Sequence, residues 1–422
     1  MFSLLEFLLA ALIAEISFVS AENVIVPGAA WTDTSGNIIQ AHGAGILKVG
    51  KIFYWFGEDK AANSALFSAV SCYISSDLVN WSRQQDALTP ISGTMISASN
   101  IVERPKVPLW LATANTPCGP YLYKGSWQPL DADSRDMGLF QDKSAYLLYA
   151  SDNNQDFKIS LLDSDYYNVT SVVSQLNGAT LEAPGVVKED NIYYLIASHT
   201  SGWNPNPNKF FSSSSLSGPW SSQADIAPAD TNTYFSQNAF DLPLGSNAIY
   251  MGDRWRPDLL GSSQYIWYPL DWSTGSPQIV PADVWSVDFN AGTYTVASGQ
   301  SYEAESGSLS GSAVILTGSS FSGGKAVGYL GNGGSVTISN VEGNGQGGQW
   351  IALYYTNADS TWRNTTVRST VLVDQPNTGG ENVVLSVPVK LNLREGANSL
   401  TFAIDQSNCA ADLDKIVVYQ QG

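Results

Sequence analysis

The sequence predicts an all-β protein with two successive β domains, the first of which is built like a β-propeller. From Trp31 to about Val296, short aromatic segments alternate with turns of Gly, Pro, Ser and Asn, and no convincing amphipathic helix interrupts them. Within this region a strand unit recurs roughly every 40 to 55 residues, as in propellers. Beyond Ala297–Ser301, where the composition turns small and polar, a second helix-free series of alternating strands follows.

The recurring unit is an aromatic strand that is followed, after a polar stretch, by a segment closing on Asn-Trp, Gly-Pro-aromatic or a Tyr-rich strand. Each copy is expected to supply the strands of one blade. The copies are Phe53–Phe56 with Leu78–Trp81, Tyr146–Tyr149 with Tyr166–Tyr167, Tyr193–Ile196 with Leu216–Trp220, and Ile249–Met251 with Tyr265–Tyr268.

One copy of the unit is incomplete. The segment Leu111–Tyr121 ends in Gly-Pro-Tyr like an outer strand, yet far fewer residues lie between Val107 and Tyr121 than between Tyr54 and Trp81. The second blade is therefore expected to lack its aromatic inner strand and the hairpin that follows it.

The first 21 residues are expected to be a signal peptide, because they form an apolar leader that ends in the small residues Val-Ser-Ala. The leader lacks Lys and Arg and contains Glu6 and Glu15, but the sequons at Asn80, Asn168 and Asn364 also favour a secreted, extracellular glycoprotein. The expected domains are residues 22–297 for the propeller and 302–420 for a β-sandwich of the jelly-roll kind.

Charge and composition restrict the ligand class. The 422 residues carry 38 Asp and Glu against 20 Lys and Arg, a formal net charge of -18, which makes nucleic acid and anionic membranes unsuitable partners. The 13 Trp and 20 Tyr suit a neutral, hydroxyl-rich ligand such as a sugar, although most of them are equally explained by packing. Three cysteines allow one internal disulfide, and Cys72 with Cys118 is the pair we expect.

Carboxylates are the expected catalytic groups. Only two His are present, which argues against a His-rich zinc site, and no nucleophile elbow, phosphate-binding loop or dinucleotide fingerprint occurs. Glu182 begins an apolar run before Ala-Pro-Gly, and a carboxylate held against apolar neighbours is suited to donate a proton. An ordinary surface Glu beside a turn is the alternative. Glu58, Glu103 and Asp136 are further candidates, and two carboxylates that flank a glycosidic bond suffice to hydrolyse it.

Specific motifs then resemble those of a known family. Glu182-Ala-Pro-Gly and Arg135-Asp-Met-Gly-Leu-Phe-Gln-Asp resemble glycoside hydrolase family 43, whose members are five-bladed propellers. His42-Gly-Ala-Gly, Glu103-Arg-Pro-Lys, Ser198–Trp203, Ser236–Phe240 and Gly252–Trp255 resemble its fungal exo-β-1,3-galactanases. The Tyr-Glu-Ala-Glu opening at Tyr302 and the Asp-Leu-Asp-Lys-Ile close at Asp412 resemble carbohydrate-binding module family 35.

The resemblance implies roles for individual residues in the first domain. Glu182 corresponds to the general acid and Asp136 to the carboxylate that orients it and tunes its pKa. The usual Asp base near the start of the first blade is absent from Ala41–Leu47, and Gln237 is expected to position and activate the water instead. The expected substrate contacts are Glu58, Glu103, Arg104, Asn154, Thr200 and Trp203.

For the C-terminal module, acidic residues at both ends suit a structural Ca²⁺, with Glu303, Glu305 and Asp414 as ligands. No cofactor is expected for catalysis. Cys409 stands where related modules often carry an aromatic residue. The expected sugar contacts are Tyr355, Asp359, Trp362, Arg363 and Asn408.

We therefore expect a secreted, inverting exo-β-1,3-galactanase that releases galactose from the β-1,3-galactan backbone of arabinogalactan and acts as a monomer. Two alternatives stay open. One is another family 43 activity, such as an arabinofuranosidase or a xylosidase. The other is a galactan-binding protein with impaired catalysis, because the second blade is incomplete.

Overall fold

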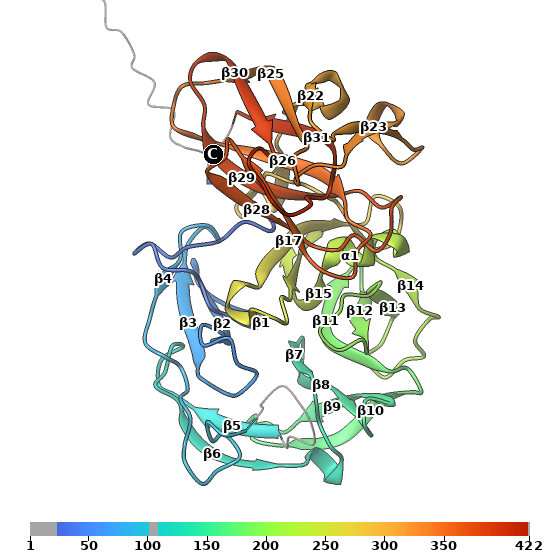
Figure 1. The fold of residues 1–422 in the computed structure, drawn as a ribbon. Helices are drawn as coiled ribbons and strands as arrows, with labels where there is room; N and C mark the ends of the chain where they lie inside the picture. Colours follow the sequence, from blue (N-terminus) through green and yellow to red (C-terminus); the bar gives the residue numbers. More distant parts are fainter. Residues whose placement is uncertain (1–22, 101–108, 421–422) are drawn as a thin grey trace, which may run out of the picture.

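The structure is a computed structural model that describes residues 23–100 and 109–420 (Figure 1). Nearly all its regular structure is β-strand, so the expected all-β class is confirmed. In the described part of the chain, no helix is long and apolar enough to cross a membrane. The predicted leader over residues 1–21 lies outside the described residues.

Four antiparallel sheets of four strands make up most of the N-terminal part. In each sheet the strands pair in chain order, as consecutive hairpins do. The sheets comprise β1 (His42–Val49), β2 (Ile52–Glu58), β3 (Val70–Ser75) and β4 (Ser82–Arg83); β7 (Met137–Gln141), β8 (Ala145–Ser151), β9 (Asp156–Leu162) and β10 (Val169–Asn177); β11 (Leu181–Glu189), β12 (Ile192–His199), β13 (Lys209–Ser213) and β14 (Ala224–Asp225); and β15 (Gln237–Leu244), β16 (Asn247–Arg254), β17 (Gln264–Asp271) and β18 (Gln278–Ile279).

The sheets are placed around a common centre, with the first strand of each on the inside (Figure 1). Strand β11 contacts both β7 and β15, and β15 also contacts β1. The buried aromatic rings of Trp55, Trp81, Trp267 and Trp285 belong to one hydrophobic cluster that joins the first and last of these sheets. Side chains at the open ends of the inner strands therefore point toward one shared space.

The second sheet is short, as the spacing of its sequence predicted. It has two strands, β5 (Leu109–Thr113) and β6 (Leu122–Trp127), where the other four sheets have four. Among the described residues, no inner strand lies between β1 and β7. Leu139 on β7 is 68% exposed.

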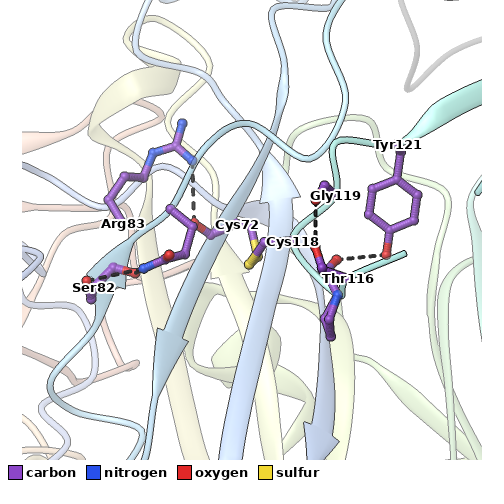
Figure 2. Close-up of a disulfide and its surroundings, with 9 residues drawn as sticks. Cys72, Ser82, Arg83, Thr116, Cys118, Gly119 and Tyr121 are labelled. Atoms are coloured by element: carbon purple, nitrogen blue, oxygen red, sulfur yellow. Dashed lines mark hydrogen bonds between the residues drawn. A yellow bond between two sulfur atoms is a disulfide. The ribbon is translucent and has the colours of Figure 1, made fainter. Parts of the chain in front are cut away.

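A disulfide ties this short sheet to the first one. Cys72 on β3 is bonded to Cys118, as expected, across a sequence separation of 46 residues (Figure 2). Beside the bridge, Tyr121 donates a hydrogen bond to the Pro117 carbonyl at 2.8 Å. Cys409 is free and exposed.

The C-terminal module consists of two further sheets, and a hairpin of β19 (Trp285–Asp288) and β20 (Thr293–Val296) precedes it. The larger sheet contains β21 (Gly299–Glu303), β23 (Val314–Thr317), β24 (Lys325–Gly328), β26 (Gly348–Thr356), β29 (Leu385–Asn392) and β31 (Asp412–Tyr419). The smaller sheet contains β22 (Ser308–Ser310), β25 (Ser335–Gly343), β27 (Arg363–Val367), β28 (Val371–Gln375) and β30 (Gly396–Phe402).

The linker expected over Ala297–Ser301 is shorter than predicted. Strand β21 already begins at Gly299 and pairs with β31, so the last residues of the expected linker belong to a strand of the larger sheet. The small polar residues there had suggested a linker, but the backbone pairing with β31 keeps them in a strand. The remaining elements are the helical turns η1 (Pro129–Asp131), η2 (Ala229–Thr231), α1 (Asn232–Phe235), η3 (Leu260–Ser262), η4 (Ala304–Ser306) and η5 (Ser322–Gly324).

Candidate active site

The inner ends of the sheets open into a cavity of about 340 Å³. Glu58, Asp136 and Glu182, which were predicted from separate parts of the sequence, all line it. So do Gln237 and Trp203, and the four-stranded sheets each contribute side chains. A second cavity of about 340 Å³ shares Asp136 and Glu182 with the first, and its lining residues are Arg135, Asp136, Asn153, Asn154, Glu182, Thr200, Ser201 and Gly202.

Glu182 is the second residue of β11, and its side chain is only 7% exposed. Its Oε1 accepts a hydrogen bond of 2.6 Å from the Nδ2 of Asn154 on the neighbouring sheet. The pairing of β11 with β12 shifts between Glu182 and Gly185, and Ala183 has a φ of 51°. Such a bulge changes the direction of a side chain. Here the carboxyl group of Glu182 is buried at the cavity wall, and the amide of Asn154 holds it in place.

The bulge is held in place by β15. Asn238 Nδ2 lies 3.2 Å from both the Ala183 carbonyl oxygen and Asp241 Oδ2. Gly185 leaves no room for a side chain, because an added Cβ would lie 2.0 Å from Asp241 Oδ2. Burial raises the pKa of Asp241 to about 7, and the hydrogen bond from Asn238 opposes this shift. Asn238 therefore connects the backbone next to Glu182 to the buried carboxyl group of Asp241 on the adjacent sheet.

Asp136 directly precedes β7 and lines both cavities together with Glu182. Its backbone oxygen accepts a hydrogen bond of 3.1 Å from the amide of Ala150, which fixes the end of the inner strand. The side chain is half-buried. Asp136 thus reaches the same space as Glu182, as its predicted role requires.

Gln237 is the first residue of β15, and neighbouring side chains hold both ends of its amide. Its Nε2 donates to the Ser198 hydroxyl at 2.9 Å, and its Oε1 accepts from the indole Nε1 of Trp255 at 3.0 Å. Ser198 Oγ in turn lies 3.5 Å from the backbone oxygen of Glu182. One hydroxyl therefore links the predicted water-positioning residue to the strand that carries the predicted acid.

The sequence prediction missed a buried pair at this cavity, His42 and Asp253. His42 Nδ1 lies 3.0 Å from Asp253 Oδ1, and Asp253 Oδ2 accepts a 2.8 Å hydrogen bond from the amide of Gly43. The imidazole stacks on Tyr265 with a centroid distance of 4.9 Å. Both residues lie in motifs noted in the sequence, but a role for Asp253 could have been inferred only from its place at the end of a strand.

The other predicted contacts of the first domain are distributed around the cavities. Glu58 pairs with the fully buried Lys60 at 3.0 Å. Trp203 packs edge-on against Trp255, with ring centroids 4.9 Å apart. Thr200 is exposed at the second cavity. Glu103 and Arg104 were also predicted, and they lie outside the described residues.

The geometry can be compared with known proteins. The sequence profile of "Glycosyl hydrolases family 43" matches residues 94–240. An exo-β-1,3-galactanase from Phanerochaete chrysosporium, solved with galactose and, as variants, with β-1,3-galactotriose, is 68% identical; the match covers 94% of this chain and 100% of that chain with a TM-score of 0.91. An exo-β-1,3-galactanase from Clostridium thermocellum is 28% identical, with 86% and 88% of the two chains covered and a TM-score of 0.61. No curated protein sequence matches the chain.

The chain belongs to glycoside hydrolase family 43. It is a glycoside hydrolase. The cavity at the inner strand ends, with Glu182 and Asp136 on its wall, is the candidate active site of this family 43 chain.

In the C-terminal module of this family 43 hydrolase, Tyr355, one of the five predicted sugar contacts, is buried, and Trp362, another, is half-buried against the first domain. Tyr355 is 0% exposed, lies in the hydrophobic core and donates a hydrogen bond to the Pro376 carbonyl at 2.9 Å. Tyr355 lies two residues after the core residue Leu353 on β26. Residues two apart on a strand share a face, so Tyr355 points to the inner face of the sheet. Trp362 packs against Phe235 of the first domain and is therefore part of the contact between domains.

The other three predicted sugar contacts of the module lie together near its surface. Arg363 Nη2 pairs with Asp359 Oδ2 at 2.6 Å, and its Nη1 donates to the Ala410 carbonyl at 2.8 Å. Asn408 is exposed, and its Nδ2 donates to Asn364 Oδ1 at 3.0 Å. These groups can present polar atoms to a ligand from one region.

The predicted calcium ligands of this family 43 chain are also near one another. Ser322 bridges two of them, because its hydroxyl donates to Glu303 and its amide donates to Asp414 Oδ1, both at 2.8 Å. Within the described residues, Oε2 of Glu303 and Oε2 of Glu305 are buried without a hydrogen-bond donor. Burial, followed by the charges of Glu303 and Glu305, raises the pKa of Asp414 to about 6.

These observations suit a cation, but the carboxylates alone do not complete a site. In the described ranges, no group of three or more His, Cys, Asp or Glu side chains is arranged to hold a metal ion. Ca²⁺ also takes backbone carbonyl, amide and hydroxyl oxygens as ligands, so Glu303, Glu305 and Asp414 would need such oxygens beside them to complete a site. A calcium ion there would add positive charge to a group of carboxylates whose neighbours include Lys415.

Proposed function

We propose that this chain is a secreted, inverting exo-β-1,3-galactanase that removes galactose from the β-1,3-galactan backbone of arabinogalactan. The observation that carries the proposal is the placement of Glu182 and Gln237 on the wall of one cavity, connected through Ser198. The relatives solved with β-1,3-galactotriose and galactose support this choice of substrate.

In the proposed reaction, Glu182 gives its proton to the glycosidic oxygen as the bond from that oxygen to the anomeric carbon breaks. Asn154 keeps the carboxyl group in place for this transfer. A water molecule bonds to the anomeric carbon from the opposite face, and the proton that it loses passes to a neighbouring solvent water. Gln237 orients that water through its fixed amide, while Asp136 keeps Glu182 protonated until the transfer.

We infer inversion from the chemistry of Gln237, the residue proposed to act opposite the acid Glu182. Retaining enzymes need a second carboxylate that attacks the sugar and forms a covalent intermediate. The amide of Gln237 cannot do this, and both oxygens of Asp253, the other carboxylate at that side of the cavity, are bound by His42 and Gly43. Direct attack by water is therefore the route that these side chains support.

We further propose that the five N-terminal sheets are the blades of a five-bladed β-propeller with a truncated second blade. The C-terminal sheets would form a β-sandwich carbohydrate-binding module of family 35, with Ca²⁺ held at Glu303, Glu305 and Asp414. Residues 1–21 would act as the secretion signal, and the enzyme would be monomeric. Asn80 and Asn168 are exposed and are suitable for glycosylation.

The test is incubation of the full chain with β-1,3-galactan while the anomers of the released sugar are followed by NMR. We expect α-galactose first, from the chain end, with mutarotation to the β anomer afterwards. Early β-galactose would contradict inversion. Release of arabinose or xylose from the corresponding aryl glycosides, without release of galactose, would assign another family 43 activity.

A second candidate function is galactan binding without effective catalysis, and it is favoured by the two-stranded second sheet. An incomplete blade would leave backbone groups of the adjoining strands without strand partners. Galactan binding with hydrolysis no faster than that of a Glu182→Gln control would select this function. Galactose release well above that control would eliminate it.

A further inference from the structure

A residue of the first domain is built into the hydrophobic core of the C-terminal module. Phe235 is 8% exposed and clusters with core residues of the module such as Leu353 and Leu385. Its ring meets Trp362 edge-on, with centroids 6.0 Å apart. The neighbouring Tyr234 packs against the cores of both domains. The module therefore holds a short segment of the first domain directly.

That segment is strained. The four residues from Asn232 to Phe235 all have positive φ, with values of 48°, 55°, 54° and 55°. The left-handed region is unfavourable for residues with a Cβ, and successive residues in it are uncommon. Such a conformation persists only where the surroundings determine it. The turn thus depends on its contacts with the rest of the molecule.

One of these contacts comes from the strand that borders the active site. Arg254 is 2% exposed, and its Nη2 and Nε donate to the carbonyl oxygens of Tyr234 and Phe235 at 2.9 and 3.3 Å. Arg254 follows Asp253, which lines the active-site cavity. The guanidinium therefore connects the strained turn to the cavity wall.

The turn ends at Phe235, two residues before Gln237. Only Ser236 lies between Phe235 and Gln237, and its backbone is extended with φ of −149° and ψ of 161°. The Ser236 hydroxyl donates to the Thr233 carbonyl at 2.6 Å, so it is tied back to the turn. A displacement of Phe235 would consequently move the catalytic amide.

The module also contacts the segment that carries Trp255, the hydrogen-bond donor to Gln237. The Gln237 amide accepts a hydrogen bond from Trp255, and the next residue, Arg256, reaches into the module. Its Nη1 pairs with Asp374 at 2.6 Å, and its guanidinium lies 4.9 Å from the centre of the Trp362 ring. Trp362 thus touches both the segment that precedes Gln237 and the segment that carries its hydrogen-bond donor.

We propose that the C-terminal module is a positioning element for catalysis, in which Trp362 holds Phe235 and Arg256 and thereby fixes the amide of Gln237. The inference rests on the proposed role of Gln237 in water activation. Trp362 acts through other residues and touches neither substrate nor reacting atoms. Its role is then separate from any binding of polysaccharide by the module.

The first experiment compares Trp362→Ala with the unmodified full chain, using β-1,3-galactotriose as substrate. We expect kcat to fall about 10- to 100-fold, the scale of a small misplacement of a catalytic group, while KM changes by less than about 2-fold. Trp362→Phe, which keeps an aromatic edge for Phe235, should recover most of kcat. Asp374→Asn, which weakens only the Arg256 contact, should lower kcat by a smaller factor without removing core volume.

The matched control is Leu400→Ala, which removes apolar volume from the same module core on β30. It should lower the midpoint of thermal unfolding and leave kcat unchanged at a temperature where the protein is folded. If Leu400→Ala lowers kcat as much as Trp362→Ala does, general destabilisation explains both variants and the proposal is wrong.

The second experiment is a double-mutant cycle with Gln237→Ala. If Trp362 acts through Gln237, Trp362→Ala should cost almost nothing in kcat once Gln237 has been replaced. Multiplicative losses would overturn the inference. An unchanged kcat in Gln237→Ala alone would contradict the proposed function instead, and a low kcat in Gln237→Ala with a normal kcat in Trp362→Ala would contradict only the role of the module.

Discussion

The indole Nε1 of Trp255 donates a hydrogen bond of 3.0 Å to Oε1 of Gln237. An indole N–H can only donate, so the oxygen of this amide is the atom that faces Trp255, and the nitrogen faces Ser198. The orientation of the amide is therefore determined by chemistry, whereas Asn and Gln orientations generally have to be assigned from their surroundings. A neutral side chain can direct a water molecule only if its own atoms are held in this way.

Replacing Trp255 with Phe should release the amide of Gln237 while keeping a ring beside His42 and Trp203. The loss of one buried hydrogen bond is worth about 1 kcal/mol, so we expect kcat to fall by roughly 5-fold. Steady-state kinetics on β-1,3-galactotriose would measure this. Trp272→Phe, which alters a ring that packs on Tyr194 away from the cavity, is the control, and equal effects of the two substitutions would contradict the prediction.

Replacing Glu182 with Gln should slow the hydrolysis of β-1,3-galactotriose far more than that of an activated aryl β-galactoside. General acid catalysis contributes roughly 10² to 10⁴ in rate, and it matters least where the leaving group needs no proton. Kinetics on both substrates would measure the ratio. Glu189→Gln, at the other end of β11, should leave both rates unchanged. Equal losses on the two substrates in Glu182→Gln would show that Glu182 is not the acid.

Asp241 should make the protein less stable as the pH rises from about 4 to about 7. Its pKa is about 7 in the folded protein and 3.8 ordinarily, so in this range the unfolded chain releases a proton that the folded protein keeps. The free energy of unfolding therefore falls with increasing pH across this window and is level above it. At about 1.4 kcal/mol per pKa unit, the upper limit is about 4 kcal/mol.

Asp241→Asn should remove this contribution, because the amide stays neutral at every pH. Denaturant unfolding at several pH values between 4 and 8 would show the variant gaining stability relative to the unmodified protein as the pH rises. Asp258→Asn, at an exposed position, should show no such trend. A constant difference between Asp241→Asn and the unmodified protein over this range would contradict the assignment.

Loss of the bridge between Cys72 and Cys118 should destabilise the first domain. The bond closes a loop of 46 residues, and the chain-entropy relation for a loop of this length gives about 4 kcal/mol. Thermal unfolding of a Cys72→Ala, Cys118→Ala double variant would measure the change. Cys409→Ser should have little effect, since that cysteine is free and exposed. An unfolding midpoint in the double variant equal to that of the unmodified chain would argue against the bridge.

Addition of Ca²⁺ should stabilise the C-terminal module more at pH 7.5 than at pH 4.5. The pKa of Asp414 is raised to about 6, so its carboxyl group keeps a proton at the lower pH and competes with a cation. A ligand at 100 times its dissociation constant stabilises the folded state by about 2.7 kcal/mol. Unfolding with Ca²⁺ and with a chelator would measure this, and Glu305→Gln should weaken the effect whereas Glu342→Gln, at an exposed site, should not. Identical midpoints with and without Ca²⁺ would exclude the site.

The sequence by itself determined the all-β class, the series of sheets and the short second sheet. These are local properties, because strand alternation repeats every two residues and turn residues mark the ends. It also identified Glu182 and Asp136 from the motifs around them, and both line the cavity. The sequence also allows Tyr355 to be assigned to the core. It follows Ile351 and Leu353 at a spacing of two residues on one strand, and residues at that spacing share a face.

Only the tertiary structure decided the contacts between distant parts of the chain. His42 and Asp253 are 211 residues apart and form one buried pair, and neither local sequence indicates the other. Trp362 reads as an exposed aromatic at a sugar site, yet it covers Phe235 because the two domains dock there. Trp362 directly precedes β27, and whether a side chain at such a position meets solvent or another domain depends on that docking, which no local sequence pattern encodes.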